Sequence, residues 1–163
     1  MPNLLTHLNL ALRAVAVLND PGIDRDVGSF LLGSTAPDIR AVTKWSRDTT
    51  HFASLEVEGV GAGADGLFYA NPALLNVVAE SEVTRAFVAG YICHLVADET
   101  WITKIYRPYF GNHDVFPDPM EAKIYDRAFQ LELDRAALEQ IGSMEVVVEA
   151  LHESDLGIDV GFI

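Results

Sequence analysis

The sequence predicts an all-α protein, a compact multi-helix single domain over residues 1–163. Three observations lead to this prediction. Apolar residues recur at spacings of three and four through most segments, which is the period of an amphipathic helix. Proline and glycine separate these segments, as they do at helix ends. Half of the residues are hydrophobic, and a chain of this length can bury a substantial core as one domain.

The N-terminal quarter predicts two helices. Residues 3–19 form the first helix, with one stripe made of Leu4, His7, Leu8, Ala11, Val15 and Leu18. Asp20, Pro21 and Gly22 are typical of a break and end it there. A second, short helix is expected over 24–32, with Gly33 as its C-terminal cap.

Two consecutive segments, 33–52 and 56–71, are expected to be irregular. The first has no clean period, and Pro37 biases Ala36 away from helical geometry, so Asp38 should lie on a loop or at a helix start. Four glycines within residues 56–71 predict a flexible loop, which could act as a lid over a site.

The remaining chain predicts further helices. Pro72 suits the first turn of one helical region, and a long helix should run from about Glu82 to Tyr106, ending near Pro108. A Gly/Pro-rich loop, GNHDVFPDP, should follow. Helices over 118–141 and 143–153 come next, and the apolar positions of the first of them include Ile124, Phe129, Leu131, Leu133 and Leu138. The tail 155–163 is expected to pack or dock.

Composition narrows the location and the partners. A net charge of −13 does not suit non-specific binding to nucleic acid or anionic membrane, so we expect no stable nucleic-acid complex. No apolar run reaches the roughly 18 residues of a transmembrane helix, and no basic leader precedes the first apolar stretch. Cys93 is the single cysteine, which suits a reducing compartment. These features favour a cytoplasmic protein, and its apolar tail could serve a contact in a homo-oligomer.

One buried-looking stripe carries polar residues. In YICHLVADETW, His94 and Asp98 are four apart, so they project from one face of the long helix and could grip one ion together. Burying them costs free energy unless each finds a partner. A His–Asp pair at this spacing is also a common structural feature of helices, and the motif by itself is a weak signal.

Three other residues strengthen the metal interpretation. His7 lies on the core stripe of the first helix, Asp38 follows Pro37, and His51 lies between hydroxyls and an aromatic ring. Taken singly they read as a core histidine, a helix N-cap and a loop residue. Together with His94 and Asp98 they make five potential ligands, of a kind that suits zinc, manganese or iron. Asp48 is a further candidate, as a residue that orients His51.

Four motifs stand in series over roughly residues 1–105: THL, FLLGSTAPDIR, DTTHF and GYICHLVADETW. Their order resembles the zinc-dependent phospholipase C and S1-P1 nuclease family. This resemblance implies an all-α fold with a metal cluster between helices. It also implies that Asp38, His51, His94 and Asp98 hold one zinc, and that Asp98 bridges to a second ion bound by His7. This chain has no second His-x-x-x-Glu pair with which to hold a third ion, so one or two ions are expected.

The function expected from this resemblance is metal-dependent hydrolysis of a small phosphoester or a lipid head group. The ions would activate a bound water as the nucleophile and bind phosphate oxygens, and Asp98 or Asp38 would orient the nucleophile. Three alternatives stay open: a metal-stabilised helical module without catalysis, a plain helical interaction domain, and an HD-type phosphohydrolase using His113 and Asp114. The Gly/Pro context of that dipeptide favours a solvated loop instead.

Overall fold

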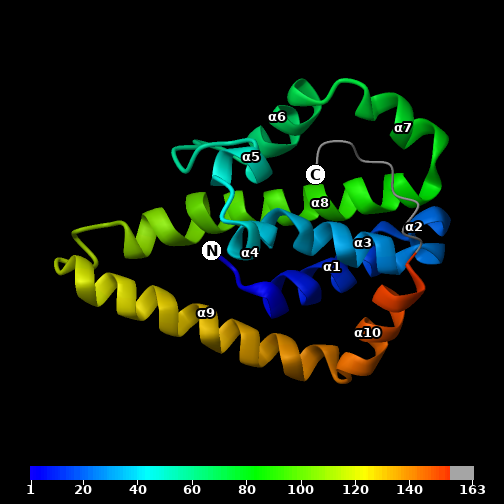
Figure 1. Cartoon of the computed structure of the whole chain (residues 1–163). Coiled ribbons are helices and arrows are strands. Elements are labelled where there is room, and N and C mark those ends of the chain that lie inside the picture. Colours follow the sequence, from blue (N-terminus) through cyan, green and yellow to red (C-terminus); the bar gives the residue numbers. More distant parts are fainter. Residues whose placement is uncertain (155–163) are drawn as a thin grey trace.

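The computed structural model describes residues 1–154, and every regular element in this range is a helix (Figure 1). The all-α prediction is therefore confirmed. The tail 155–163, for which packing or docking was predicted, lies outside the described residues. The elements, in chain order, are α1 (Leu4–Leu18), α2 (Pro21–Arg25), α3 (Val27–Thr35), the 3-10 helix η1 (Ala36–Ile39), α4 (Arg40–Thr43), α5 (Arg47–His51), α6 (Ala62–Ala70), α7 (Leu74–Glu80), α8 (Glu82–Thr100), the π-helix η2 (Trp101–Phe110), α9 (Pro119–Ile141) and α10 (Met144–Glu153).

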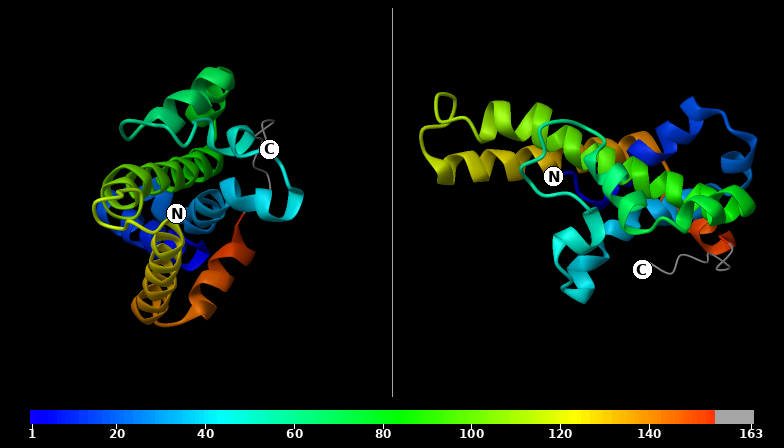
Figure 2. Two further views of the ribbon diagram at one scale, coloured as in Figure 1. Left: turned by 90° about the vertical axis from the view of Figure 1, so that its left-hand side faces the viewer. Right: turned by 90° about the horizontal axis from the view of Figure 1, so that it is seen from above.

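Helix α8 is the centre of the arrangement. Helices α3 and α1 pack along one side of it, and α6 and α7 pack along another (Figures 1 and 2). Helix α9 lies against α1 and η2, while α10 packs on α3. Most of the buried apolar residues form two clusters, one between α1, α2, α3, α8 and α10 and one between α6, α7 and α8. A central helix that is covered on several sides can hold polar groups away from water.

Two glycines bring α3 and α8 into close contact. A Cβ atom added at Gly33 would lie 1.9 Å from the carbonyl oxygen of Phe87, and one added at Gly90 would lie 1.9 Å from that of Phe30. Each helix thus needs a residue without a side chain where the other backbone passes. The prediction that Gly33 caps a helix is wrong, because α3 continues to Thr35. Gly33 instead allows the backbones of α3 and α8 to pack closely.

The chain between α1 and α3 differs from the expectation. Asp20 lies just after α1 and is the N-cap of α2. Its carboxylate accepts hydrogen bonds from the backbone N–H of Gly22 (2.8 Å) and Ile23 (3.2 Å). Pro21 then occupies the first helical turn. The expected helix over 24–32 is therefore two helices, α2 and α3, that meet at Asp26.

The glycine-rich segment is only partly a loop. Residues 52–61 have no helix, whereas Ala62–Ala70 forms α6. Glu99 of α8 fixes this junction, because its carboxylate accepts hydrogen bonds from the N–H groups of Gly61 and Gly63, both at 2.5 Å. Gly66 allows the α6 backbone to approach Phe52, whose carbonyl oxygen would lie 2.3 Å from an added Cβ. These glycines permit close packing, so the prediction of a flexible loop over 56–71 fails for its second half.

The long helix has the predicted start and nearly the predicted extent. Ser81 caps α8 by accepting a hydrogen bond from the N–H of Thr84 at 3.2 Å. After Thr100 the winding changes to a π-helix that contains Pro108 and ends at Phe110. None of the helices within residues 1–154 is long and apolar enough to cross a membrane.

Helices α9 and α10 match the predicted ranges within one residue at each end. The burial of α9 does not follow its apolar pattern. Of the apolar residues named for α9, Ile124, Phe129, Leu131 and Leu138 are exposed, whereas Ala122, Gln130 and Ala137 are buried. The inner face of α9 uses small and polar residues because α1 and η2 pack closely against it.

Candidate metal centre

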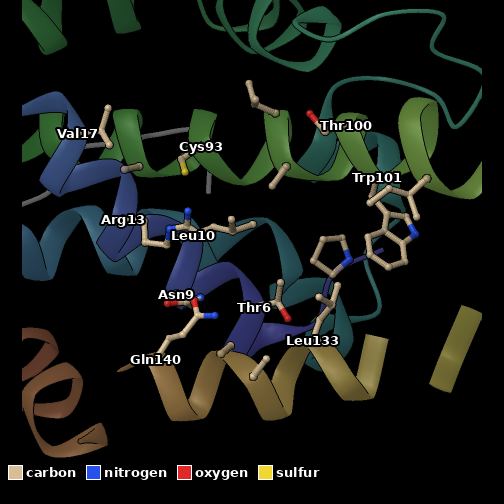
Figure 3. A pocket seen from close by; sticks show the side chains of 17 residues that line it. Thr6, Asn9, Leu10, Arg13, Val17, Cys93, Thr100, Trp101, Leu133 and Gln140 are labelled. Carbon is tan, nitrogen blue, oxygen red and sulfur yellow. Dashed lines mark hydrogen bonds between the residues drawn. The ribbon is translucent and has the colours of Figure 1, made fainter. Parts of the chain in front are cut away.

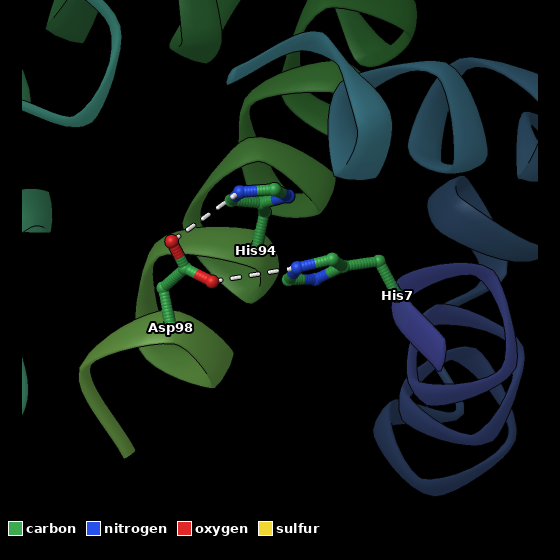
Figure 4. Close-up of side chains that lie close together, drawn as sticks. All are labelled: His7, His94 and Asp98. Atoms are coloured by element: carbon green, nitrogen blue, oxygen red, sulfur yellow. Dashed lines mark ion pairs between the residues drawn. The ribbon is translucent and has the colours of Figure 1, made fainter. Parts of the chain in front are cut away.

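The five predicted ligands meet between α1, η1, α5 and α8. The carboxylate of Asp98 is the common neighbour: its Oδ1 lies 3.4 Å from Nε2 of His7, and its Oδ2 lies 3.2 Å from Nε2 of His51 and 3.9 Å from Nε2 of His94. Oδ1 of Asp38 lies 3.9 Å from Nε2 of His51. Figure 4 shows the imidazoles of His7 and His94 turned toward the two oxygens of Asp98. The tertiary structure therefore brings together residues up to 91 positions apart in sequence.

Asp38 is more exposed to solvent than the other four predicted ligands. His7, His51, His94 and Asp98 are each at most 2% exposed, whereas the Asp38 side chain is 38% exposed. Asp38 stands in the first turn of the 3-10 helix η1, which agrees with its expected position on a loop or at a helix start. The centre is thus enclosed by three helices and opens to solvent on the side of Asp38.

The two central imidazoles are held through their Nδ1 atoms. Nδ1 of His94 lies 2.8 Å from the carbonyl oxygen of Ser34. A carbonyl oxygen can only accept, so Nδ1 carries the proton and the lone pair of Nε2 faces Asp98. Nδ1 of His51 contacts the hydroxyl of Thr50 at 2.9 Å. The suggestion that Asp48 orients His51 is wrong, since Asp48 is exposed and Thr50 takes that place. Such outer partners are typical of metal-binding histidines.

The imidazole of His7 stacks on that of His94. The rings of His7 and His94 have centroids 3.8 Å apart and planes at 11°. Thr6, the residue before His7, donates its hydroxyl (2.7 Å) and its N–H (3.1 Å) to the carboxylate of Asp134 on α9. These bonds fix the first turn of α1 and with it the position of His7.

The charges of the cluster suit a cation. Burial, with the neighbouring His7, lowers the pKa of His94 to about 3, so this ring is neutral at pH 7. Although burial opposes it, the imidazoles of His51 and His7 hold the pKa of Asp98 well below its usual range. The centre therefore presents a buried anionic carboxylate and at least one imidazole lone pair directed at it.

The residues present fit a zinc ion. Ligands about 2.0–2.2 Å from a tetrahedral zinc lie roughly 3.3 Å from each other. His7 and Asp98 (3.4 Å), His51 and Asp98 (3.2 Å), and His51 and His94 (3.4 Å) have such separations. Nε2 of His7 and Oδ1 of Asp98 are also buried without a hydrogen-bond partner among the described residues. A cation between them would satisfy both atoms.

Two sets of donor atoms are each compact enough for one ion. The first is His7, His94 and Asp98, and the second is Asp38, His51 and His94, with ligand atoms within 4.8 Å of one another in each set. His94 belongs to both sets. Which ligands serve which ion, and the bridging role of Asp98, stay predictions.

Two residues of the site were missed or misread in the sequence. Arg47 begins α5, and its Nη2 donates to Oδ2 of Asp98 at 3.0 Å. Its position four residues before His51, on the same helix face, is the signal that could have found it. Glu99 is 3% exposed, and its carboxylate accepts hydrogen bonds from the backbone N–H groups of Gly61 and Gly63.

The other histidines lie apart from this centre. His113 and Asp114 are exposed on the loop after η2, and His152 is exposed on α10. The solvated-loop interpretation of the His-Asp dipeptide is therefore confirmed. No observation in the described chain connects it with an HD-type site.

An apolar groove of about 640 Å³ runs beside the centre, between α1, α8 and α9 (Figure 3). Thr6, which precedes His7, and Ala97, which precedes Asp98, line it. Trp101 is 2% exposed and borders one end of the groove. Cys93 also lines the groove rather than the ligand cluster.

The comparison with known families agrees with the site. A family model described as zinc dependent phospholipase C matches residues 6–113, about two thirds of the chain, and this range includes all five predicted ligands. Neither a curated protein nor a solved structure matches the chain. The motif order in the sequence, the helical fold and the matched range agree, and the chain belongs to the zinc dependent phospholipase C family.

Proposed function

We propose that this protein is a metal-dependent hydrolase of phosphoesters, acting on a small phosphoester or a lipid head group. The observation that carries the proposal is the convergence of His7, His51 and His94 on the buried carboxylate of Asp98. Burying three imidazoles and a carboxylate costs free energy unless their polar atoms find hydrogen-bond partners or a metal ion. Membership of the family supplies the reaction class.

The proposed ligand assignment follows the geometry around Asp98. Asp38, His51, His94 and Asp98 would hold one zinc ion, and Asp98 with His7 would hold a second. The set Asp38, His51 and His94 supports the first ion. The contact of His7 with Oδ1 of Asp98, the carboxylate oxygen that His51 does not contact, supports the second. Thr50 and Ser34 would keep the imidazole rings oriented in either case.

The chain's own residues would then orient the reactants. When bound, zinc supplies a Lewis acid that activates water and neutralises phosphate charge. Asp38 is the ligand nearest solvent, so a phosphoester would enter on its side and water would be oriented by the carboxylate of Asp38 or Asp98. The burial of the other ligands excludes bulk water, which strengthens electrostatic interactions with a developing charge.

The test combines metal counting with hydrolysis. Protein purified without chelator should contain at least one zinc, manganese or iron per chain by elemental analysis. It should hydrolyse bis-(p-nitrophenyl) phosphate or a phospholipid, and lose this activity on chelation. Absence of a transition metal even after reconstitution would reject the metal centre. A metal-loaded protein inactive on monoesters, diesters and phospholipids would instead support the non-catalytic metal-stabilised module.

Single substitutions test the roles within the centre. His94→Ala should damage the first site, His7→Ala should lose only the second ion, and Asp98→Ala should lose both. His113→Ala is the matched control, because this exposed histidine lies outside the cluster. Full metal occupancy in Asp98→Ala would refute the bridging assignment.

A further inference from the structure

Arg47 lies against the metal centre without being one of its ligands. Its side chain is only 12% exposed, and Nη2 donates to Oδ2 of Asp98 at 3.0 Å. His51, one helical turn later on α5, contacts the same oxygen at 3.2 Å. The short helix α5 therefore directs a guanidinium and an imidazole toward one carboxylate.

Most of the hydrogen-bonding capacity of Arg47 is unused. Nε and Nη1 are buried and have no hydrogen-bond partner in residues 1–154. A guanidinium has five N–H donors and stays charged at any physiological pH. Leaving such donors buried and unpaired costs more than leaving neutral ones, so the arrangement calls for an acceptor that bears negative charge.

The surroundings of Arg47 select the kind of acceptor. Asp98 is already contacted by three imidazoles, and the neighbouring Asp38 faces His51 at 3.9 Å. A guanidinium with free N–H groups beside a carboxylate–imidazole cluster suits a tetrahedral oxyanion, whose oxygens can take two parallel hydrogen bonds.

We infer that Arg47 is a substrate-binding residue that holds non-bridging oxygens of a phosphoryl group beside the metal centre. This inference rests on the proposed function, because it names the group that recognises the phosphate of that same site. The competing role is structural: Arg47 would then only neutralise Asp98, with its remaining N–H groups left unpaired.

The experiment measures binding of inorganic phosphate by calorimetry. The proteins are zinc-loaded and dialysed free of excess metal, and zinc content is determined for each. Wild type, Arg47→Gln and Arg47→Lys are compared with Arg25→Gln. The control removes the same charge from an exposed pair with Glu82, about 24 Å along α8 from Asp98.

A direct role predicts a specific pattern. Arg47→Gln should bind phosphate at least tenfold more weakly with unchanged zinc content, Arg47→Lys should lose part of the affinity because it keeps the charge without the planar fork, and Arg25→Gln should match wild type. Wild-type phosphate affinity in Arg47→Gln would overturn the inference. So would a loss of phosphate binding that occurs only together with a loss of zinc, because Arg47 would then act through Asp98.

Hydrolysis assays separate this inference from the proposed function. If wild type hydrolyses phosphoesters and Arg47→Gln keeps the same KM and phosphate affinity, the function stands and the role of Arg47 is refuted. If wild type binds phosphate through Arg47 but hydrolyses no phosphoester, the proposed function fails and the anion site stands.

Discussion

The close contact of α3 with α8 makes Gly90→Ala an informative substitution. The added Cβ would lie 1.9 Å from the carbonyl oxygen of Phe30, about 1.5 Å short of ordinary van der Waals contact. The atom it meets belongs to a helix backbone, which cannot rotate away as a side chain can. The two helices must therefore separate or tilt locally.

Two opposing effects set the magnitude. Alanine is a better helix former than glycine by roughly 1 kcal/mol, which alone would stabilise α8. Overpacking a rigid contact costs about 3 kcal/mol, at the upper end of the usual range. The net loss is about 2 kcal/mol, which for a chain of this size lowers the melting temperature by roughly 4–8 °C.

The same displacement should reach the metal centre. Gly90 lies one turn before His94 on α8, and Ser34, whose carbonyl oxygen holds Nδ1 of His94 at 2.8 Å, lies on α3. Moving α3 away from α8 weakens this hydrogen bond and lets the imidazole turn. We expect Gly90→Ala to bind zinc more weakly than wild type as well as to melt at a lower temperature.

Thermal unfolding followed by circular dichroism, with zinc-loaded and chelated protein, measures both effects. Gly59→Ala is the control, since a Cβ there would have no neighbour within 4 Å and its melting temperature should be unchanged or slightly raised. A Gly90→Ala protein that melts at or above the wild-type temperature would show that the helices tolerate the added atom. The packing argument would then be wrong.

Three further predictions concern the supports of the site. Removing zinc with a chelator should lower the melting temperature by roughly 10 °C if zinc was present at a thousand times its Kd, and an unchanged curve after verified removal would mean that folding does not depend on the ion. Glu99→Gln should leave the N–H of Gly61 or Gly63 without its charged acceptor, which lowers the stability of this junction by about 2 kcal/mol. Limited proteolysis of residues 52–61 should then be faster than in wild type, and equal cleavage rates would contradict this role of Glu99. Asp134→Ala removes the acceptor of both Thr6 donors, so it should destabilise the start of α1 and weaken binding of the ion at His7. Metal titration measures this, and unchanged zinc stoichiometry and affinity would show that α9 does not position His7.

The sequence was sufficient wherever the information is local. Apolar spacing and the prolines and glycines between segments predicted α1, α9 and α10 close to their observed bounds, and they predicted α8 together with the first part of η2. The spacing of His94 and Asp98 placed both on one helix face, and their burial is confirmed at 1% exposure each. The motif order predicted the family, and the structure brings together the five residues that this resemblance named.

The tertiary structure alone decided how those five residues are supported. Gly33 appeared to end a helix, and only the passage of the α8 backbone at Phe87 shows why a glycine is required inside α3. Arg47 and Glu99 appeared as ordinary charged residues, because their partners Asp98 and Gly61 lie 51 and 38 positions away. The local sequence pattern indicates which segments form helices. The burial and hydrogen bonding of a residue depend instead on which distant segment packs against it. For this reason the five residues that meet at the centre could be named from the sequence, and most of the contacts of the groups around them could not.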